Sequence, residues 1–162
     1  MLGTIMYVSK FIMEFLPNIH IVGALTIAYT VVFRKKALIP IYVFVFLVLL
    51  FNGFSLWLFP YLYIWTVLWG ITMLLPKNMS KKASCIVYPV VCLIHGLLFG
   101  ILYAPAQAIL FKMSFEQMLS WIAAGFTFDI VHAIGNATAG LLVIPTVETL
   151  RRFLKNKTSF GS

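Results

Sequence analysis

Six apolar runs fill almost the whole chain, and the turns between them are short. The runs cover approximately residues 2–16, 19–33, 38–50, 54–75, 85–111 and 119–147. Of the 162 residues, 62% are apolar and only 10% are charged, so a single core in water cannot bury the apolar surface. At about 20 residues per crossing, the length holds about five to seven membrane spans and leaves no room for a soluble domain. The sequence therefore predicts an all-α polytopic membrane protein, a bundle of six transmembrane helices that forms one domain over residues 1–162.

Lysine and arginine residues occur in every second turn between the runs. They lie at residues 34–36 after the second run, at 77–82 after the fourth and at 151–157 after the sixth, while Lys112 stands alone after the fifth. In membrane proteins the cytoplasmic loops carry the excess of Lys and Arg. This pattern predicts six spans with both the N-terminus and the C-terminus in the cytoplasm.

Most of the positive charge behind the net charge of +8 lies in those short turns. Cations beside a membrane span are explained by topology and by anionic lipid, and the short turns predict no folded groove behind them. We therefore expect the lipid bilayer, and no nucleic acid, as the partner of this charge. The first run has no basic segment before it, so we expect it to remain as the first helix and not to be cleaved as a signal peptide.

Small residues recur every four positions in the fifth run, at Gly96, Gly100, Ala104 and Ala108. Such a strip lets another helix backbone approach closely. We expect it to pack within the bundle, and docking of a partner protein is the alternative. Five prolines fall near or inside the runs, where neighbouring groups must satisfy the backbone; they are at positions 40, 60, 89, 105 and 145.

Polar residues inside the apolar runs are the candidates for function, because ionisable groups are costly in hydrocarbon and face the bundle interior or a wet cavity. Asp129, His132 and Asn136 follow one another at i, i+3 and i+7, so they share one helical face. The predicted topology places them in the outer half of the sixth span. We expect this face to line a solute cavity. His132 is the nearest candidate partner of Asp129 in the sequence, and if the two pair, His132 would orient the carboxylate. A polar cluster that only holds helices together is the alternative.

Further polar and aromatic residues are predicted at a similar depth. Trp65 and Trp69 lie at i, i+4 in the fourth run, where core packing competes with a stacking wall for a flat ligand. The remaining candidates for solute binding lie near the predicted outer ends of the runs; they are Asn18, His20, Tyr103 and Gln107.

Three segments together resemble the S component of an energy-coupling factor (ECF) vitamin transporter, a small six-helix membrane subunit. The first is Lys10 followed by FLPNI at residues 15–19, which is similar to the basic residue and Pro-Asn turn of cobalamin-type members. The second is the Trp-rich fourth run, and the third is FDIVHAIGN at residues 128–136, which is similar to the final-helix pattern of several S components. The resemblance covers nearly the whole chain in layout.

The resemblance implies a substrate-capture subunit in the plasma membrane of a prokaryote. Such a subunit binds a vitamin-like solute from outside and works with a transmembrane coupling subunit and two cytoplasmic ATPases. It implies neither an enzyme nor a cofactor. The solute is left open between a corrinoid, another aromatic vitamin and a nucleobase-like precursor, and the Pro-Asn turn leans toward the corrinoid.

The first run departs from the family pattern, because S components often carry alanines four apart there and this run offers only Gly3 and Ser9 as small residues. Docking of the coupling subunit through this helix is therefore in doubt. Lys10 and Glu14 lie at i, i+4, and we expect them to form a structural ion pair.

Two other classes of protein remain as alternatives. A stand-alone gradient-driven transporter would use Asp129 as its proton carrier. An intramembrane metalloenzyme would need zinc ligands from His20, His95, His132 and Asp129, but the sequence has no HExxH motif. It also has no phosphate-binding GxxxxGK[ST] loop, so the chain is not expected to hydrolyse nucleotide through such a loop.

Overall fold

The computed structural model describes residues 1–16, 18–53 and 55–159, apart from the side chains at 57 and 157–159. Pro17 of the predicted Pro-Asn turn and Phe54 at the predicted start of the fourth run lie outside the described residues. The described residues form helices and no strands, which agrees with the all-α prediction. The helices are α1 (Leu2–Ile12), α2 (Val22–Phe33), α3 (Leu38–Asn52), α4 (Tyr61–Leu74), α5 (Lys81–Leu97), α6 (Phe99–Leu110), α7 (Phe115–Gly140) and α8 (Val143–Ser159), with 3₁₀ turns at η1 (Arg34–Ala37) and η2 (Leu56–Leu58).

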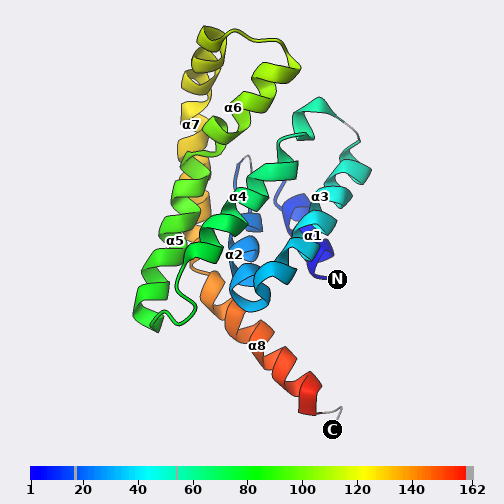
Figure 1. Cartoon of the computed structure of the whole chain (residues 1–162), viewed down its shortest axis with the longest axis vertical. Coiled ribbons are helices and arrows are strands. Elements are labelled where there is room, and N and C mark those ends of the chain that lie inside the picture. Colours follow the sequence, from blue (N-terminus) through cyan, green and yellow to red (C-terminus); the bar gives the residue numbers. More distant parts are fainter. Residues whose placement is uncertain (17, 54, 160–162) are drawn as a thin grey trace.

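The helical stretches are suited to a membrane. Among the described residues, Val22–Asn52, Lys81–Leu110 and Phe115–Gly140 are long and apolar enough to cross one, while Leu2–Ile12 and Tyr61–Leu74 are shorter apolar helices. Figure 1 shows that the first of these stretches reverses direction between α2 and α3. The reversal follows Arg34, whose φ of 53° is incompatible with a continuous α-helix.

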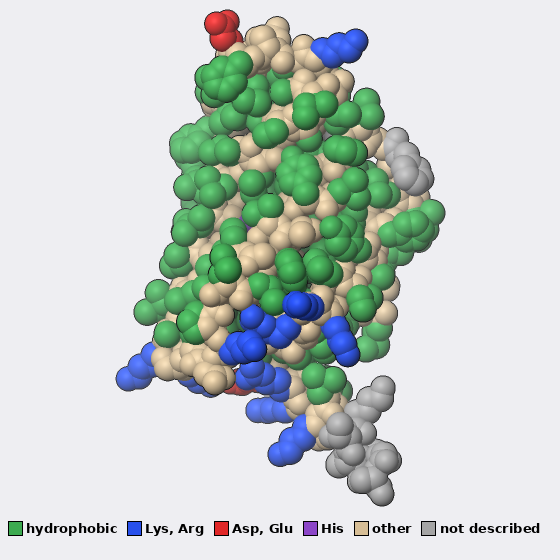
Figure 2. Space-filling view, in the orientation of Figure 1, with side chains coloured by type: hydrophobic (Ala, Val, Ile, Leu, Met, Phe, Trp, Pro, Cys, Tyr) green, Lys and Arg blue, Asp and Glu red, His purple; other side chains and the backbone are tan. Residues whose placement is uncertain are grey.

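The molecular surface has an apolar body between polar ends. Large apolar side chains are exposed along the helices, among them Phe46, Phe128 and Ile134, each more than half exposed. Figure 2 shows hydrophobic side chains covering the visible face of the body, with most Lys and Arg side chains gathered at the lower end. In water such a surface would aggregate, whereas in lipid it is solvated. The surface therefore supports a membrane-embedded protein.

Two of the six predicted runs are each divided into two helices. The fifth run breaks at Leu98, between Gly96 and Gly100, which weaken a helix locally. In the sixth run, the helix α7 ends at Gly140 and a new helix, α8, begins at Val143. Pro145 lies in the first turn of α8, where a residue without a backbone N–H is tolerated. The single helix expected over residues 119–147 is therefore replaced by α7 and by a separate α8.

The helix α2 lies at the centre of the bundle (Figure 1). All its residues from Val22 to Thr30 are buried, and it contacts α1, α4, α5, α7 and α8. Thr26 and Thr30 return their hydroxyl groups to carbonyl oxygens one turn earlier in the helix, at 2.9 and 2.6 Å. Their polar groups are thus satisfied without a partner from another helix.

The segment α5–α6 packs on α7 through glycines. A Cβ atom on Gly96 would lie 2.8 Å from the Cα atom of Ala133, and one on Gly140 would lie 2.6 Å from the Cα atom of Pro89. Both distances are too short for real side chains, so the two backbones touch only because these residues are glycines. The predicted small-residue strip therefore packs within the chain at its Gly96 end, as expected.

We predict that Gly96→Ala lowers the melting temperature of the detergent-purified protein, because the new Cβ atom collides with the α7 backbone. Overpacking of this kind costs about 1–3 kcal/mol. Gly125→Ala on α7 is the matched control, since its Cβ atom meets nothing within 4 Å. A Gly96→Ala protein as stable as the wild type would contradict the close approach of the two helices.

Candidate functional site

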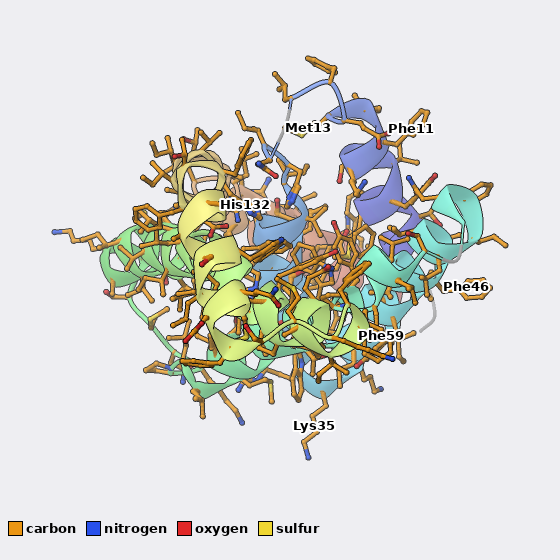
Figure 3. All side chains as sticks on the ribbon, turned by 90° about the horizontal axis from the view of Figure 1, so that it is seen from above. Phe11, Met13, Lys35, Phe46, Phe59 and His132 are labelled. Atoms are coloured by element: carbon orange, nitrogen blue, oxygen red, sulfur yellow. The ribbon has the colours of Figure 1, made fainter. Side chains whose placement is uncertain are left out.

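Asp129, His132 and Asn136 lie together on the inner face of α7. Their exposed fractions are 7%, 3% and 1%, and Figure 3 shows His132 toward the middle of the molecule while Phe11, Phe46 and Lys35 point outward. Because α7 runs from Phe115 to Gly140, the three residues lie in its half nearer α8. Their predicted place in the outer half of the membrane rests on the six-span topology and stays a prediction.

Asp129 contacts the start of α6. Its Oδ1 atom accepts a hydrogen bond of 3.0 Å from the backbone N–H of Gly100. Gly100 is in the first turn of α6, where N–H groups have no carbonyl partner within their own helix. Asp129 thus caps α6 from the neighbouring helix, and the positive end of the α6 dipole stabilises its carboxylate. The structure shows no hydrogen bond between Asp129 and His132, the candidate partner that the sequence offered.

His132 is surrounded by aromatic rings from two other segments. Its ring centroid lies 4.6 Å from that of Phe99 and 5.0 Å from that of His20, both in edge-on geometry. His20 belongs to the segment between α1 and α2, so it closes the space beside α7. Edge-on contacts place polarised ring hydrogens against π faces, which is favourable.

Trp65 on α4 forms the opposite wall. It is 1% exposed, and its indole ring lies 5.9 Å from the ring of His20 and 5.8 Å from that of His95, measured between centroids. His95 is near the end of α5, and its Nε2 atom lies 3.3 Å from the carbonyl oxygen of Ile64. The buried side chains of His20, Trp65, His95, His132 and Asn136 thus form one packed cluster, which we call the polar chamber.

Asn136 lies in the polar chamber between two glycines. Its Nδ2 atom is 3.0 Å from the position of a Cβ atom on Gly96, and its Oδ1 atom is 3.4 Å from that position on Gly23. The amide therefore occupies room that side chains on α2 and α5 would otherwise fill. Neither its oxygen nor its nitrogen has a hydrogen-bond partner in the described protein.

The polar chamber contains every fully buried side-chain nitrogen or oxygen atom of the described residues that lacks a hydrogen-bond partner. These atoms are His20 Nδ1, Trp65 Nε1, His95 Nδ1, His132 Nε2, and Asn136 Nδ2 and Oδ1. Leaving such a group unpaired costs about 1–3 kcal/mol. Their convergence in one place, with both donors and acceptors among them, is the arrangement expected of a site for a polar guest.

A cavity of about 170 Å³ adjoins the polar chamber at His20 and His132. Its lining also includes Asn18, Tyr61 and Phe99. Lys10 and Glu14 line it as well, and their charged atoms lie 3.9 Å apart, as the predicted ion pair requires. The cavity connects the chamber to the segment that joins α1 and α2.

Two of the other predicted site residues belong to different surroundings. The indole N–H of Trp69 donates a 3.1 Å hydrogen bond to the carbonyl oxygen of Arg34, so Trp69 does not join Trp65 in the chamber. Tyr103 stacks on Trp121 at 6.0 Å, and it is linked to the chamber only through Phe99, at 5.9 Å.

Gln107 is buried one turn beyond Tyr103 on α6 and does not line the 170 Å³ cavity. Two residues that bound the site, His95 and Phe99, were not among the predicted solute-binding residues. For His95 the signal was present, because an ionisable group in the middle of an apolar run points to the bundle interior. For Phe99 the sequence offers no such signal.

The chamber offers hydrogen bonding and ring contacts to a guest. Within the described residues, no three His, Cys, Asp or Glu side chains converge so that they could hold one metal ion. What the geometry provides is a set of ring faces and edges with unpaired donors and acceptors between them. A flat solute that carries its own donors and acceptors matches these groups.

Comparisons with protein families, with curated proteins and with solved structures find no match to this chain. The resemblance to S components therefore stays a prediction from the sequence. The polar chamber and the membrane-suited fold are the observations from which a function is proposed.

Proposed function

We propose that the protein is a membrane-embedded solute-capture subunit that binds a small, flat, polar solute in the polar chamber. The observation that carries this proposal is the convergence of six unpaired buried polar atoms in that one place. A bound solute with hydrogen-bond donors and acceptors would pair with these atoms and remove the free-energy cost of leaving them unpaired. Trp65, Phe99 and His132 would contact the ring of a flat solute. Binding and release of such a solute is the simplest use of the arrangement.

The size and charge of the surroundings narrow the class of solute. The adjoining cavity has a volume of about 170 Å³. A corrinoid is far larger, so the cavity favours the smaller aromatic solutes over the cobalamin-type solute toward which the Pro-Asn turn leans. Lys10 and Glu14 neutralise each other at this cavity, which favours a solute without net charge.

As in the S components that the sequence resembles, we propose that a coupling subunit and two ATPases supply the energy. The chain has no phosphate-binding loop of its own, and its polar turns are short. Asp129, the residue that a proton carrier would need, is engaged as the cap of α6. This bond supports the ATP-driven proposal over the gradient-driven one.

For the membrane topology we propose six crossings, formed by α1, α2, α3, α4, the α5–α6 segment and α7. The support is the gathering of Lys and Arg at one end of the apolar body (Figure 2). Under this topology that end faces the cytoplasm of a prokaryotic cell, with α8 on the same side. The turn between α6 and α7 then faces outward.

The solute is tested by mass spectrometry of small molecules released from gently extracted, purified protein. We predict that the wild type carries one and that Asn136→Leu reduces it about tenfold or more, because two hydrogen-bonding atoms are lost. The same variant should melt at an equal or higher temperature, since an apolar group of similar shape replaces unpaired polar atoms.

Thr138→Val on the same helix is the control, because Thr138 is exposed and bonds only to the carbonyl of Ile134 at 3.0 Å. It should keep the solute. A lower melting temperature of Asn136→Leu with an unchanged amount of solute would show that Asn136 is a packing residue and would refute the proposed site.

The topology is tested with single cysteines in a background that lacks Cys85 and Cys92. We predict that cysteines at Lys35 and Lys81 resist an impermeant thiol reagent added to intact cells, while a cysteine at Glu116 reacts, because among these three positions only Glu116 lies at a turn that faces outward. Permeabilised cells give the labelling control for each position. Reaction at Lys81 in intact cells would rule out the six-span arrangement.

The energy source is tested by measuring uptake of the co-purified solute. In a host that lacks the coupling subunit and the ATPases, uptake should vanish, while the isolated protein should still bind the solute. Uptake by the purified single chain in liposomes would instead establish the gradient-driven alternative.

A further inference from the structure

A second cavity, of about 490 Å³, lies at the basic end of the molecule. It opens between the α4–α5 turn and α8, about 21 Å along α5 from His95 at 1.5 Å per residue. A neighbouring cavity of about 230 Å³ shares Lys77, Tyr88 and Arg151 with it and adds Arg34. We call the two together the basic cavity.

The charge around the basic cavity is strongly positive. Ten of the twelve Lys and Arg residues belong to the three basic segments 34–36, 77–82 and 151–157, since only Lys10 and Lys112 lie elsewhere in the sequence. Glu148, three residues before Arg151, is the one acidic residue close to these segments in the sequence. Glu148 accepts a 3.0 Å hydrogen bond from Lys81. This bond and the charge of Lys81 lower the pKa of the Glu148 carboxyl, so Glu148 stays ionised and compensates Lys81.

Two cations of the basic cavity have no such compensation. Among the described residues, no carboxylate forms an ion pair with Lys77 or Arg151. The buried residues Ser84 and Tyr88 line the cavity beside them. The positive N-terminal end of the α5 dipole, at Ser80 and Lys81, faces the same space. All these groups favour an anion with several acceptor oxygens.

The other wall of the basic cavity is apolar. It is formed by Val31 on α2 and by Ile144 and Val147 at the start of α8. Figure 2 shows that the basic end borders the exposed apolar body directly. A water-soluble anion would gain nothing from contact with this apolar wall. An anionic lipid carries an acyl chain next to its phosphate, and this chain can pack against the wall.

We propose that the basic cavity binds one anionic glycerophospholipid, with its phosphate against Lys77 and Arg151 and one acyl chain along Val31, Ile144 and Val147. Basic pockets between helices at the level of the head groups are suited to this kind of ligand. The bound lipid supplies the negative charge that the chain lacks at this end, and it joins α8 to the α4–α5 turn.

The experiment is native mass spectrometry of the full chain in detergent, titrated with phosphatidylglycerol and, as the neutral reference, phosphatidylcholine. We expect one phosphatidylglycerol to bind in preference to phosphatidylcholine. The double variant Lys77→Gln/Arg151→Gln should weaken this binding roughly 30-fold, at about fivefold for each cation lost. The matched control is Lys35→Gln/Lys36→Gln, which removes the same charge at the same end without touching the cavity lining. It should change binding less than about twofold.

Glu148→Gln provides a test with the opposite sign. The substitution frees Lys81 to bind the phosphate, so it should strengthen phosphatidylglycerol binding about fivefold. A variant with a damaged fold would bind the lipid more weakly and not more tightly. Equal weakening by the two double variants would overturn the proposal, because it would mean a diffuse attraction to the whole basic end. Displacement of the lipid by equimolar glycerol phosphate would also overturn it, in favour of a water-soluble phosphate ligand.

Discussion

The close contact between α5–α6 and α7 is the constraint on which the rest of the structure depends. Helices in lipid gain little from apolar burial against each other, so backbone packing at small residues has to hold them together. Gly96 and Gly140 allow that packing, at Ala133 and Pro89. Asn136 lies beside Gly96 at this contact, and His95, the preceding residue, contacts Trp65 and Phe99. The glycine contact therefore determines how closely α5 packs on α7, and with it where the polar side chains of the chamber lie.

The unpaired polar atoms of the polar chamber reduce the folding stability of the protein. Leaving a buried polar group unpaired costs about 1–3 kcal/mol, and six such atoms lie together here. The whole stability of a typical domain is only about 5–15 kcal/mol. A cluster of unpaired polar atoms is therefore unusual where packing is the only role. Apolar side chains of the same volume would pack without this cost, which means that the polar groups need another reason to be there, and binding a polar guest is such a reason.

Helical periodicity was enough to predict which residues of α7 face inward, because positions i, i+3 and i+7 must share a side. It could not predict the breaks at Leu98 and Gly140, since glycine and proline in an apolar run are compatible with a straight, a kinked or a divided helix. Nor could it predict that His95 lies in the chamber and Trp69 does not. Trp69 is about 6 Å along α4 from Trp65, which is enough to bring it to the carbonyl of Arg34 instead. Such contacts depend on how helices cross, which no spacing within one helix specifies.

The chamber and the basic cavity are different in chemistry but share the central helix. On α2, Gly23 lies against Asn136 and Val31 lines the basic cavity, about 12 Å farther along the axis. Substituting Lys77 or Arg151 therefore leaves the polar atoms of the chamber in place. A movement of α2 along its axis, however, would change the room beside Asn136 and the apolar wall at Val31 together, because a buried helix moves as a rigid unit. Any coupling between solute in the chamber and lipid in the basic cavity would have α2 as one direct physical connection and α5, which carries both His95 and Tyr88, as the other.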